Sequence, residues 1–414
     1  MPRHITITAN ALLITVVIAL VIGIICSSLI LLAYNDFAVD RSVRTDHRLQ
    51  RDLQSAINMV LADTSLIMSG RPDTVDLFNQ GMDSALVIKE NWGIFDMAGI
   101  TVMQHGHART KCFFFGPPPD TPLDACLYLA QHNIPLYIAG TTLLTGDAYL
   151  PKGGIQPAYI EQRSFSNAKP LTGNPRASDS LPLPDPRLIS LLYRRDTGLT
   201  LTSFPDTLQQ SFADTPAILH LKRPITLSGC ALSGHIVIIS DSSIQVAAGC
   251  MLENVILIAP YIELERGFTG TLQAIAADSI VMDNDCHLGY PSCLILSKQP
   301  SSVSQPIIRI GDTCSITGMV LALAPAPNDN IKTYVELGRN STVTGYLYVG
   351  GFLFLKGSVN GTVLTDYLLY KSSPSIYQNY LVDVPIDRTA LSAYFAGPHI
   401  FNTPLANKII QWVK

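Results

Sequence analysis

The sequence has 414 residues, which is long enough for two or three domains. Hydrophobic residues make up 47% of it and charged residues 14%, so it is more apolar than an ordinary soluble protein, and one membrane segment beside a β-rich domain would account for the excess. The net charge of −4, with no run of Lys or Arg and no basic aromatic stripe, argues against nucleic acid as a partner.

The N-terminal segment from Ile5 to Tyr34 contains no charged residue. Residues 11–33 alone would cross a hydrocarbon core of about 30 Å at about 1.5 Å per helical residue. A cleaved signal peptide has an apolar region of about 7 to 15 residues and a small-residue cleavage site, and this run is too long and lacks a clean site. The sequence therefore predicts a transmembrane anchor over residues 1–35 in a single-pass cell-membrane protein, with the lipid bilayer around residues 5–34.

The sidedness of this anchor has two interpretations. Basic residues are more frequent after the apolar run (Arg41, Arg44, Arg48, Arg51) than before it (Arg3, His4). This count favours a cytoplasmic C-terminal bulk. A β-rich repeat domain behind a short N-terminal tail is commoner among exported anchors. We predict the exported side, periplasmic or extracellular, with a cytoplasmic bulk as the alternative.

Residues 36–70 are predicted to continue the helix as an amphipathic stalk, because Leu49, Leu53 and Ile57 recur at helical spacing between polar residues, up to about Ile67. A long helix, apolar first and amphipathic after, ahead of a β-rich head resembles the layout of pilins and pseudopilins. Only the plan matches, since the Gly-Phe cleavage site and the Glu five positions after it are absent. The resemblance implies a minor component of a pilus-like or secretion-like machine.

Residues 71–140 are predicted to form a small antiparallel β-rich domain of four short strands. The strands are expected at Ala85–Lys89, Trp92–Met97, Ile100–Gln104 and Lys111–Phe115, with tight turns at Glu90-Asn91 and Ala98-Gly99. Residues 141–215 then hold an outlying repeat phrase at Leu144–Pro151, a Pro- and Ser-rich insertion from Ser164 to Pro186, and a short helix at Leu188–Tyr193.

Residues 216–371 repeat one short phrase: an apolar residue, a small polar one, usually Gly, and an apolar run. Copies begin at Leu232, Leu252, Phe268, Ile316, Val343 and Val359. A second register places Ile244, Ile262 and Ile280 at equal spacing, with Cys250, Phe268 and Cys286 following at the same offset. Such a period, in runs rich in β-branched residues, predicts a parallel β-solenoid (β-helix). A β-sandwich, the alternative, would not keep equivalent residues evenly spaced.

The phrases Thr342–Gly345 and Ser358–Val363, with Gly350-Gly351 between them, resemble the polymer-forming β-helix of bactofilins. The outlying copy at Leu144 is similar. The resemblance covers about a third of the chain and implies a β-helix that stacks end to end; bactofilins lack a large N-terminal module. Residues 372–414 are predicted to be a C-terminal cap, with a strand at Ile376–Val384, a helix at Asp387–Tyr394 and an apolar tail at Ile409–Val413 that covers the last coil or contacts a partner.

The chain offers few residues for chemistry. Asp283-Asn284-Asp285 with His287 and Asp278 are the best acidic candidates for glycan cleavage, and turn chemistry explains them equally. His105-Gly106-His107 could ligate a metal but has no nearby carboxylate or Cys, so a hairpin turn is favoured. Cysteines at coil positions are expected to pack as apolar residues, whereas Cys112 and Cys126 could form a disulfide.

We therefore predict a mainly β protein that is not an enzyme, with no catalytic, cofactor or metal residue assigned. Its predicted role is that of a membrane-anchored structural or assembly protein of the bacterial cell envelope. The solenoid would supply a rigid surface for protein partners or self-association. The alternative is a β-helix carbohydrate-active enzyme or glycan-binding protein, which would need carboxylates gathered in one groove.

Overall fold

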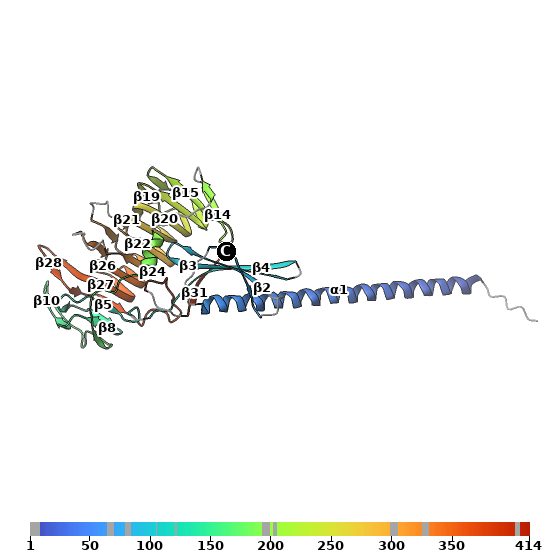
Figure 1. Cartoon of the computed structure of the whole chain (residues 1–414), viewed down its shortest axis with the longest axis horizontal. Coiled ribbons are helices and arrows are strands. Elements are labelled where there is room, and N and C mark those ends of the chain that lie inside the picture. The colour runs from blue at the N-terminus through green and yellow to red at the C-terminus, as the bar shows by residue number, and fades with distance from the viewer. Residues whose placement is uncertain are drawn as a thin grey trace, which may run out of the picture. The chain divides into compact units, whose positions relative to one another are not determined.

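The structure is a computed structural model that describes residues 9–63, 70–78, 84–104, 106–120, 122–192, 199–201, 205–298, 305–324, 331–401 and 406–414. The chain divides into two compact units, which are described separately below. The first holds the residues up to 58 with 74–86 and 100–109, and the second holds 59–73, 87–99 and 110–414. Most elements are strands, as predicted (Figure 1).

One long helix, α1 (Ala9–Ala62), supplies most of the first unit. Residues 11–33 are exposed throughout, and among the described residues this is the one helix long and apolar enough to cross a membrane. Burial begins further along, at Leu49, Leu53 and Ile57. The helix therefore changes from an apolar rod to an amphipathic one without a break, as predicted. It ends at Ala62, and residues 64–69 of the expected stalk lie outside the described residues.

The small sheet has strand order β1-β2-β3-β4-β31. Its strands are β1 (Asp73–Asp76), β2 (Ser84–Trp92), β3 (Phe95–Gln104), β4 (His107–Gly116) and β31 (Lys408–Val413). Three strands, not the predicted four, occupy residues 84–116, because Ala98-Gly99 lies inside β3 and the turn falls at Gly93. Gly93 has φ +60°, and a Cβ there would lie 2.1 Å from Gln273 Oε1. That buried side chain fixes the turn from a distant strand.

The tail Ile409–Val413 was predicted either to cover the last coil of the repeat or to contact a partner, and the first of these was wrong. β31 pairs antiparallel with β4, with Val413 opposite Cys112 and Lys408 opposite Gly116. The Cys112–Cys126 disulfide that the sequence left open is not formed in this structure, since both thiols are free. The two cysteines belong to different hydrophobic clusters, because Cys126 faces the interior of the parallel sheet and Cys112 packs outside it.

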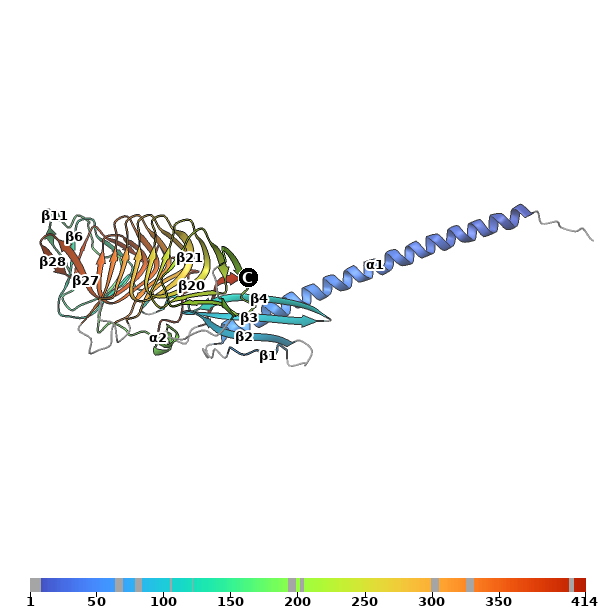
Figure 2. The same ribbon diagram turned by 90° about the horizontal axis from the view of Figure 1, so that it is seen from above.

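A large parallel sheet dominates the second unit (Figure 2). Its strands are β5 (Leu127–Leu129), β7 (Leu143–Thr145), β8 (Ala148–Leu150), β12 (Pro175–Ala177), β13 (Leu199–Leu201), β14 (Thr207–Gln210), β15 (Ala217–Leu221), β16 (Ile225–Leu227), β17 (Ala231–Gly234), β18 (Ile236–Ser240), β19 (Ser243–Val246), β20 (Met251–Leu264), β21 (Thr269–Met282), β22 (His287–Leu296), β23 (Ile307–Ile310), β24 (Ser315–Ala322), β25 (Thr333–Leu337), β26 (Thr342–Leu355), β27 (Ser358–Ser372), β28 (Ser375–Gln378) and β30 (Pro385–Asp387). β28 alone is attached as an antiparallel hairpin to β27.

The predicted register of this sheet is confirmed at its centre. Ile244 pairs with Ile262, and Ile262 pairs with Ile280, so the three side chains stand in one file. The file continues in both directions through residues that the even spacing did not include: Ile225, Ile308, Val335, Leu353 and Leu368. Each of these side chains is buried in one apolar cluster that fills the space enclosed by the strands.

Strand pairing in this sheet also closes on itself, which the sequence did not predict. The strands β21, β22, β24, β26, β25 and β23 form a closed six-strand circuit. The closure arises because two long strands each pair with two partners. The first part of β21 pairs with β22 and its end with β23, while the first part of β26 pairs with β24 and its end with β25.

A segment from early in the sequence covers the end of this sheet. β27 pairs with β5, β5 with β8, and β8 with β12, all in parallel. The outlying phrase at Leu144 thus joins the repeat, but beyond its last strand instead of ahead of its first. Three small strands extend the same end, β29 (Tyr380–Val382), β6 (Leu136–Ala139) and β9 (Ile155–Pro157), near the hairpin of β10 (Tyr159–Ile160) and β11 (Arg163–Ser164) (Figure 2).

Part of the outer side of the sheet is covered too. Ile256, Ile295 and Tyr348 point outward into a second apolar cluster that includes Trp92, Phe114 and residues of α2 (Pro186–Leu192), the short helix predicted from the sequence. The middle part of β20, Val255–Ala259, is mostly buried on both sides and reads as a continuous apolar run, whereas the ends of the strand alternate between buried and exposed residues. The helix predicted at Asp387–Tyr394 is absent: β30 occupies the start of that segment, and the rest is turns that pack Leu391 and Phe395 against the sheet.

Three glycines are aligned on neighbouring strands, which leads to a first prediction. Gly318, Gly345 and Gly361 are paired in one file, and a Cβ on Gly345 (φ +135°) would lie 2.0 Å from the carbonyl oxygen of Gly318. Gly345→Ala should therefore lower the free energy of unfolding by about 1–3 kcal/mol or more. Gly249→Ala is the control, since nothing lies within 4 Å of its Cβ. Equal urea midpoints for the two variants would contradict the register.

Candidate functional site

The strongest candidate site is a cavity of about 220 Å³ in the second unit, lined by both polar and apolar side chains, which we call the Asp96 cavity. Three separate segments line it: the β2–β3 turn, the start of α2, and the loop that follows β30. The lining residues are Asn91, Ile94, Asp96, Asp185, Arg187, Leu188, Ser190, Leu191 and His399. The backbone N–H of Asp185 donates to the carbonyl of Ile400 at 2.8 Å, which holds the second and third segments together.

Local sequence explains how two of the side chains are placed. Asp185 stands immediately before the helix and is followed by Pro186, the pattern of an N-cap with proline at the first helical position. Its Oδ1 accepts a hydrogen bond from the backbone N–H of Arg187 at 2.8 Å. The Arg187 guanidinium then donates to Asp185 Oδ2 at 2.9 Å, so the cap is also an ion pair.

The β2–β3 turn places Asp96. Gln273 of β21 accepts from the N–H of Ile94 at 3.0 Å and donates to the carbonyl of Trp92 at 2.9 Å. Trp92 packs edge-on against His235 and Phe212. These buried contacts fix the turn, and Asp96 follows it with 7% of its surface exposed.

Burial dominates the electrostatics of the cavity. It raises the pKa of Asp96 to about 7, although the Arg187 charge and a 2.8 Å hydrogen bond from Asn91 act in the opposite direction. Burial also pushes the pKa of Asp185 upward, but the hydrogen bonds and charge of Arg187 together outweigh it and leave that pKa lowered. The pKa of His399 is lowered by burial, against the effect of its hydrogen bond to Asn407.

The pair of Asp96 and His399 is therefore poised to hold one proton near neutral pH. His399 Nε2 lies 3.5 Å from Asp96 Oδ2 and 3.0 Å from Asn407 Oδ1. With Nε2–H as the donor, the buried Nδ1 is an acceptor, and it has no hydrogen-bond partner among the described residues. The Asp96 carboxyl and the His399 imidazole can therefore exchange a proton. Asp185 is held as a helix cap, which leaves it poorly placed as a second reacting carboxylate.

The acidic residues singled out from the sequence lie outside the Asp96 cavity. Their side chains contact residues of neighbouring turns of the chain. Asp285 (φ 62°) is paired with Arg266 at 2.7 Å and hydrogen-bonded to Thr313. Asn284 accepts from the backbone N–H of Asp312 at 2.7 Å, and His287 Nδ1 lies 2.8 Å from Ser315 Oγ. Both Asp285 and Asn284 therefore bond to residues of neighbouring turns, and not to their own backbone as turn chemistry alone predicted. Asp278 lies within β21, away from these corner contacts.

The histidine pair predicted as a turn is only partly described. Gly106 lies in the turn between β3 and β4 with φ 81°, and His107 begins β4, while His105 falls outside the described residues. Among the residues that the structure describes, no three His, Cys, Asp or Glu side chains are grouped to hold a metal ion.

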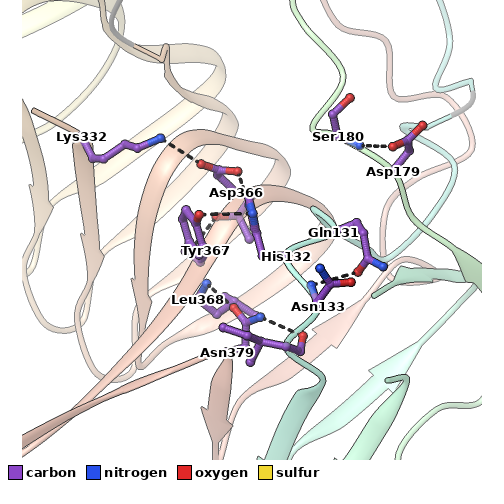
Figure 3. Close-up of polar contacts among 12 residues, drawn as sticks. Gln131, His132, Asn133, Asp179, Ser180, Lys332, Asp366, Tyr367, Leu368 and Asn379 are labelled. Atoms are coloured by element: carbon purple, nitrogen blue, oxygen red, sulfur yellow. Dashed lines mark hydrogen bonds and ion pairs between the residues drawn. The ribbon is translucent and has the colours of Figure 1, made fainter. Parts of the chain in front are cut away.

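A second polar cluster ties the early segment to the last coil (Figure 3). His132 Nε2 lies 2.7 Å from Asp366 Oδ1, and its ring stacks on Tyr367 with centroids 4.1 Å apart. Lys332 Nζ reaches the same carboxylate at 3.4 Å. Below them, Asn379 donates to the carbonyl of Ile134 at 3.2 Å. Each polar group faces a partner within the cluster, so we interpret it as a clasp between β27 and the chain after β5.

No protein-family model matches the chain, and no curated protein or solved structure is significantly similar to it. The residues of the Asp96 cavity were missed by sequence reasoning because each stands alone along the chain. Asp185 could have been recognised from the sequence as a helix cap, since it stands with Pro186 just ahead of a predicted helix. Asp96 and His399 had none, because their meeting depends on contacts between segments about three hundred residues apart.

Proposed function

We propose that this protein is a membrane-anchored structural or assembly protein of the bacterial cell envelope. In this proposal the apolar part of α1 crosses the bilayer, and the parallel sheet is a β-solenoid head on the exported side. The single observation that carries the proposal is the apolar, fully exposed helix surface over residues 11–33, which continues without a break into a buried, amphipathic part.

Exposed apolar surface on this scale supports a bilayer as its surroundings. Each fully buried Leu or Ile contributes roughly 1.5–3 kcal/mol when it leaves water, so more than ten exposed residues of this kind would be costly in solution. The residues that follow the apolar run also suit the interface between membrane and water. Tyr34 and Phe37, both exposed, follow the apolar run, as aromatic residues do at headgroup depth, and arginines follow them.

The solenoid interpretation of the head rests on its pairing. All pairings along the interior file are parallel and in register, and three aligned glycines turn the same corner. Such coils cannot bury their apolar side alone, so a stack of them behaves as one rigid body. The six-strand closure is compatible with this proposal, because a strand that bends around a corner pairs with two partners and links neighbouring faces.

The ends of the stack bear on how it would assemble. The bactofilin resemblance suggests end-to-end stacking, but the far end carries the short strand β12, which is fully exposed and begins with Pro175. A three-residue edge strand with proline is a blunted edge. We therefore propose that partners contact the side of the head, as in a minor component of a pilus-like or secretion-like machine.

The anchor leads to a direct test. Leu20→Arg combined with Ile24→Arg, one helical turn apart, should release the protein from membranes, because each charge costs about 2.5–3.5 kcal/mol at the bilayer centre. The matched control places two arginines at Gln54 and Asn58, which are exposed one turn apart on the same helix beyond the apolar run. The measurement is resistance to alkaline carbonate extraction. A wild-type protein that is extracted, or a double variant that is retained, would contradict the anchor.

Sidedness needs a separate measurement. Protease added to intact spheroplasts should digest the head if it is exported. Digestion only after the membrane is permeabilised would favour the cytoplasmic alternative, and crosslinking before lysis would then identify neighbours on the correct side.

A further inference from the structure

The interior of the parallel sheet contains a file of sulfur atoms at one corner. The file runs through Cys230, Cys250, Phe268, Cys286 and Cys314, which are aligned by the register of the strands that follow them. Phe268 separates it into two pairs. Cys230 Sγ lies 3.4 Å from Cys250 Sγ, and both side chains are buried. The thiols are free.

The backbone geometry of the first pair suits a covalent link. Adjacent strands of a sheet are about 4.8 Å apart. A disulfide needs Cα atoms about 4.4–6.8 Å apart with side chains directed toward each other. Ala231 pairs in register with Met251, which places the two preceding cysteines opposite one another, and their sulfur atoms are in contact. Closing the bond therefore requires a change of side-chain torsion and little movement of the backbone.

We propose that Cys230 and Cys250 are a disulfide site that ties two successive coils when the head folds in an oxidising compartment. This proposal rests on the exported placement proposed above for its occurrence in the cell, while the geometry is a property of the folded chain. The second pair is a weaker candidate, because Cys286 and Cys314 also donate to backbone carbonyls, at 3.1 Å to Glu265 and 3.0 Å to Asp283.

The reaction is thiol–disulfide exchange with a disulfide oxidant, such as oxidised glutathione or a disulfide oxidoreductase. The Cys230 thiolate attacks one sulfur of the oxidant and releases one thiolate from it. The Cys250 thiolate then attacks the Cys230 sulfur of the mixed disulfide and releases the second. The two cysteines are oxidised, the oxidant is reduced to two thiols, and the two cysteine protons pass to those thiols.

The burial of Cys230 determines when the disulfide can form. Burial raises the pKa of Cys230 to about 12, so the thiolate that starts the exchange is scarce once the coil has closed. The bond should therefore form during folding, before the interior is packed. A protein that has already folded in the reduced state should react slowly with both oxidants and alkylating reagents. Phe268 stands between the two pairs in this file, so no bond is expected from one pair to the other.

The test is refolding of the full chain in detergent with oxidised or reduced glutathione, followed by thiol titration and nonreducing peptide mapping. Oxidative refolding should lower the titre by two thiols per chain and yield a peptide joining Cys230 to Cys250. Cys250→Ser should abolish that peptide, and Cys126→Ala, which removes another buried thiol, should leave it. If Cys250→Ser does not fold, the wild-type map alone carries the assignment.

The outcomes separate this proposal from the proposed function. A native fold with all thiols free after oxidative refolding would overturn the disulfide site, whatever the compartment. A link that forms in vitro but is absent when cells are quenched with a thiol-blocking reagent would keep the site and place the head in a reducing compartment. A link found in cells as well as in vitro supports both.

Discussion

Replacing Ile262 by alanine is expected to lower the free energy of unfolding of the second unit by about 2–5 kcal/mol. Ile262 is 1% exposed and stands between Ile244 and Ile280 in the interior file. Truncation would leave a cavity that the strands on either side, held by their own hydrogen bonds, can close only in part. Urea unfolding followed by tryptophan fluorescence reports on this unit, because both tryptophans, Trp92 and Trp412, belong to it.

The control for this variant is the neighbouring residue. Tyr261 points to the opposite side of the same strand and is 48% exposed, so Tyr261→Ala should cost no more than about 1 kcal/mol. The prediction depends on which of the two side chains faces inward. A larger loss for Tyr261→Ala than for Ile262→Ala would mean that the strand is turned over, and the register would be wrong.

The second large effect concerns pH and the Asp96 cavity. The pKa of Asp96 is raised from 3.8 to about 7 in the folded protein, so the folded state favours the protonated carboxyl. At a pH below the pKa of the unfolded state, the Asp96 carboxyl is protonated in both states and does not change the free energy of unfolding. As pH rises from about 4 to 7 the penalty grows, and above 7 it reaches about 4 kcal/mol at about 1.4 kcal/mol per pKa unit. Asp96→Asn should therefore match the wild type at pH 4 and be more stable by up to about 4 kcal/mol at pH 8.

A variant at Asp185, whose pKa is shifted in the opposite direction, tests whether charge in the cavity causes the pH dependence. The pKa of Asp185 is lowered in the folded protein, so its charge contributes stability above the unfolded pKa that is lost as pH falls through the folded value. Asp185→Asn should thus destabilise the protein at pH 8, and the difference should shrink in acid. The readout is the urea midpoint from pH 4 to 8. Parallel profiles for the two variants would refute the assignment of charge in this cavity.

The sequence predicted the centre of the head well because local spacing is enough there. Ile244, Ile262 and Ile280 are separated by equal numbers of residues, and Gly345 pairs with Gly361 as the repeated phrase implied. The copy at Phe268 was misaligned by two residues, since Leu252 pairs with Gly270 and Asn254 forms a bulge. The even spacing also ends after Ile280, because more residues separate Ile280 from Ile308 and Ile308 from Val335.

The parts that the sequence did not predict depend on contacts between distant segments. Nothing local to Leu127–Leu129 indicates that it pairs with Val363–Thr365, and the tail Lys408–Val413 is as apolar as a cap for the last coil would be. The turn at Gly93 is specified by Gln273, which no local pattern relates to it. The Asp96 cavity has the same origin, because a buried carboxylate becomes unusual only when its surroundings are known.

The most direct test of the account is a pair of pulsed electron paramagnetic resonance distances in the full chain, with Cys26→Ser as background. One nitroxide stands at Thr226 and the other at Arg309 or at Glu336, which lie four and five coils along one outward-facing file. At about 4.8 Å per coil, the backbone separations should be about 19 and 24 Å, so the second distance should exceed the first by about 5 Å. Equal distances, or a shorter one to Glu336, would contradict a stack of coils and with it the proposed β-solenoid.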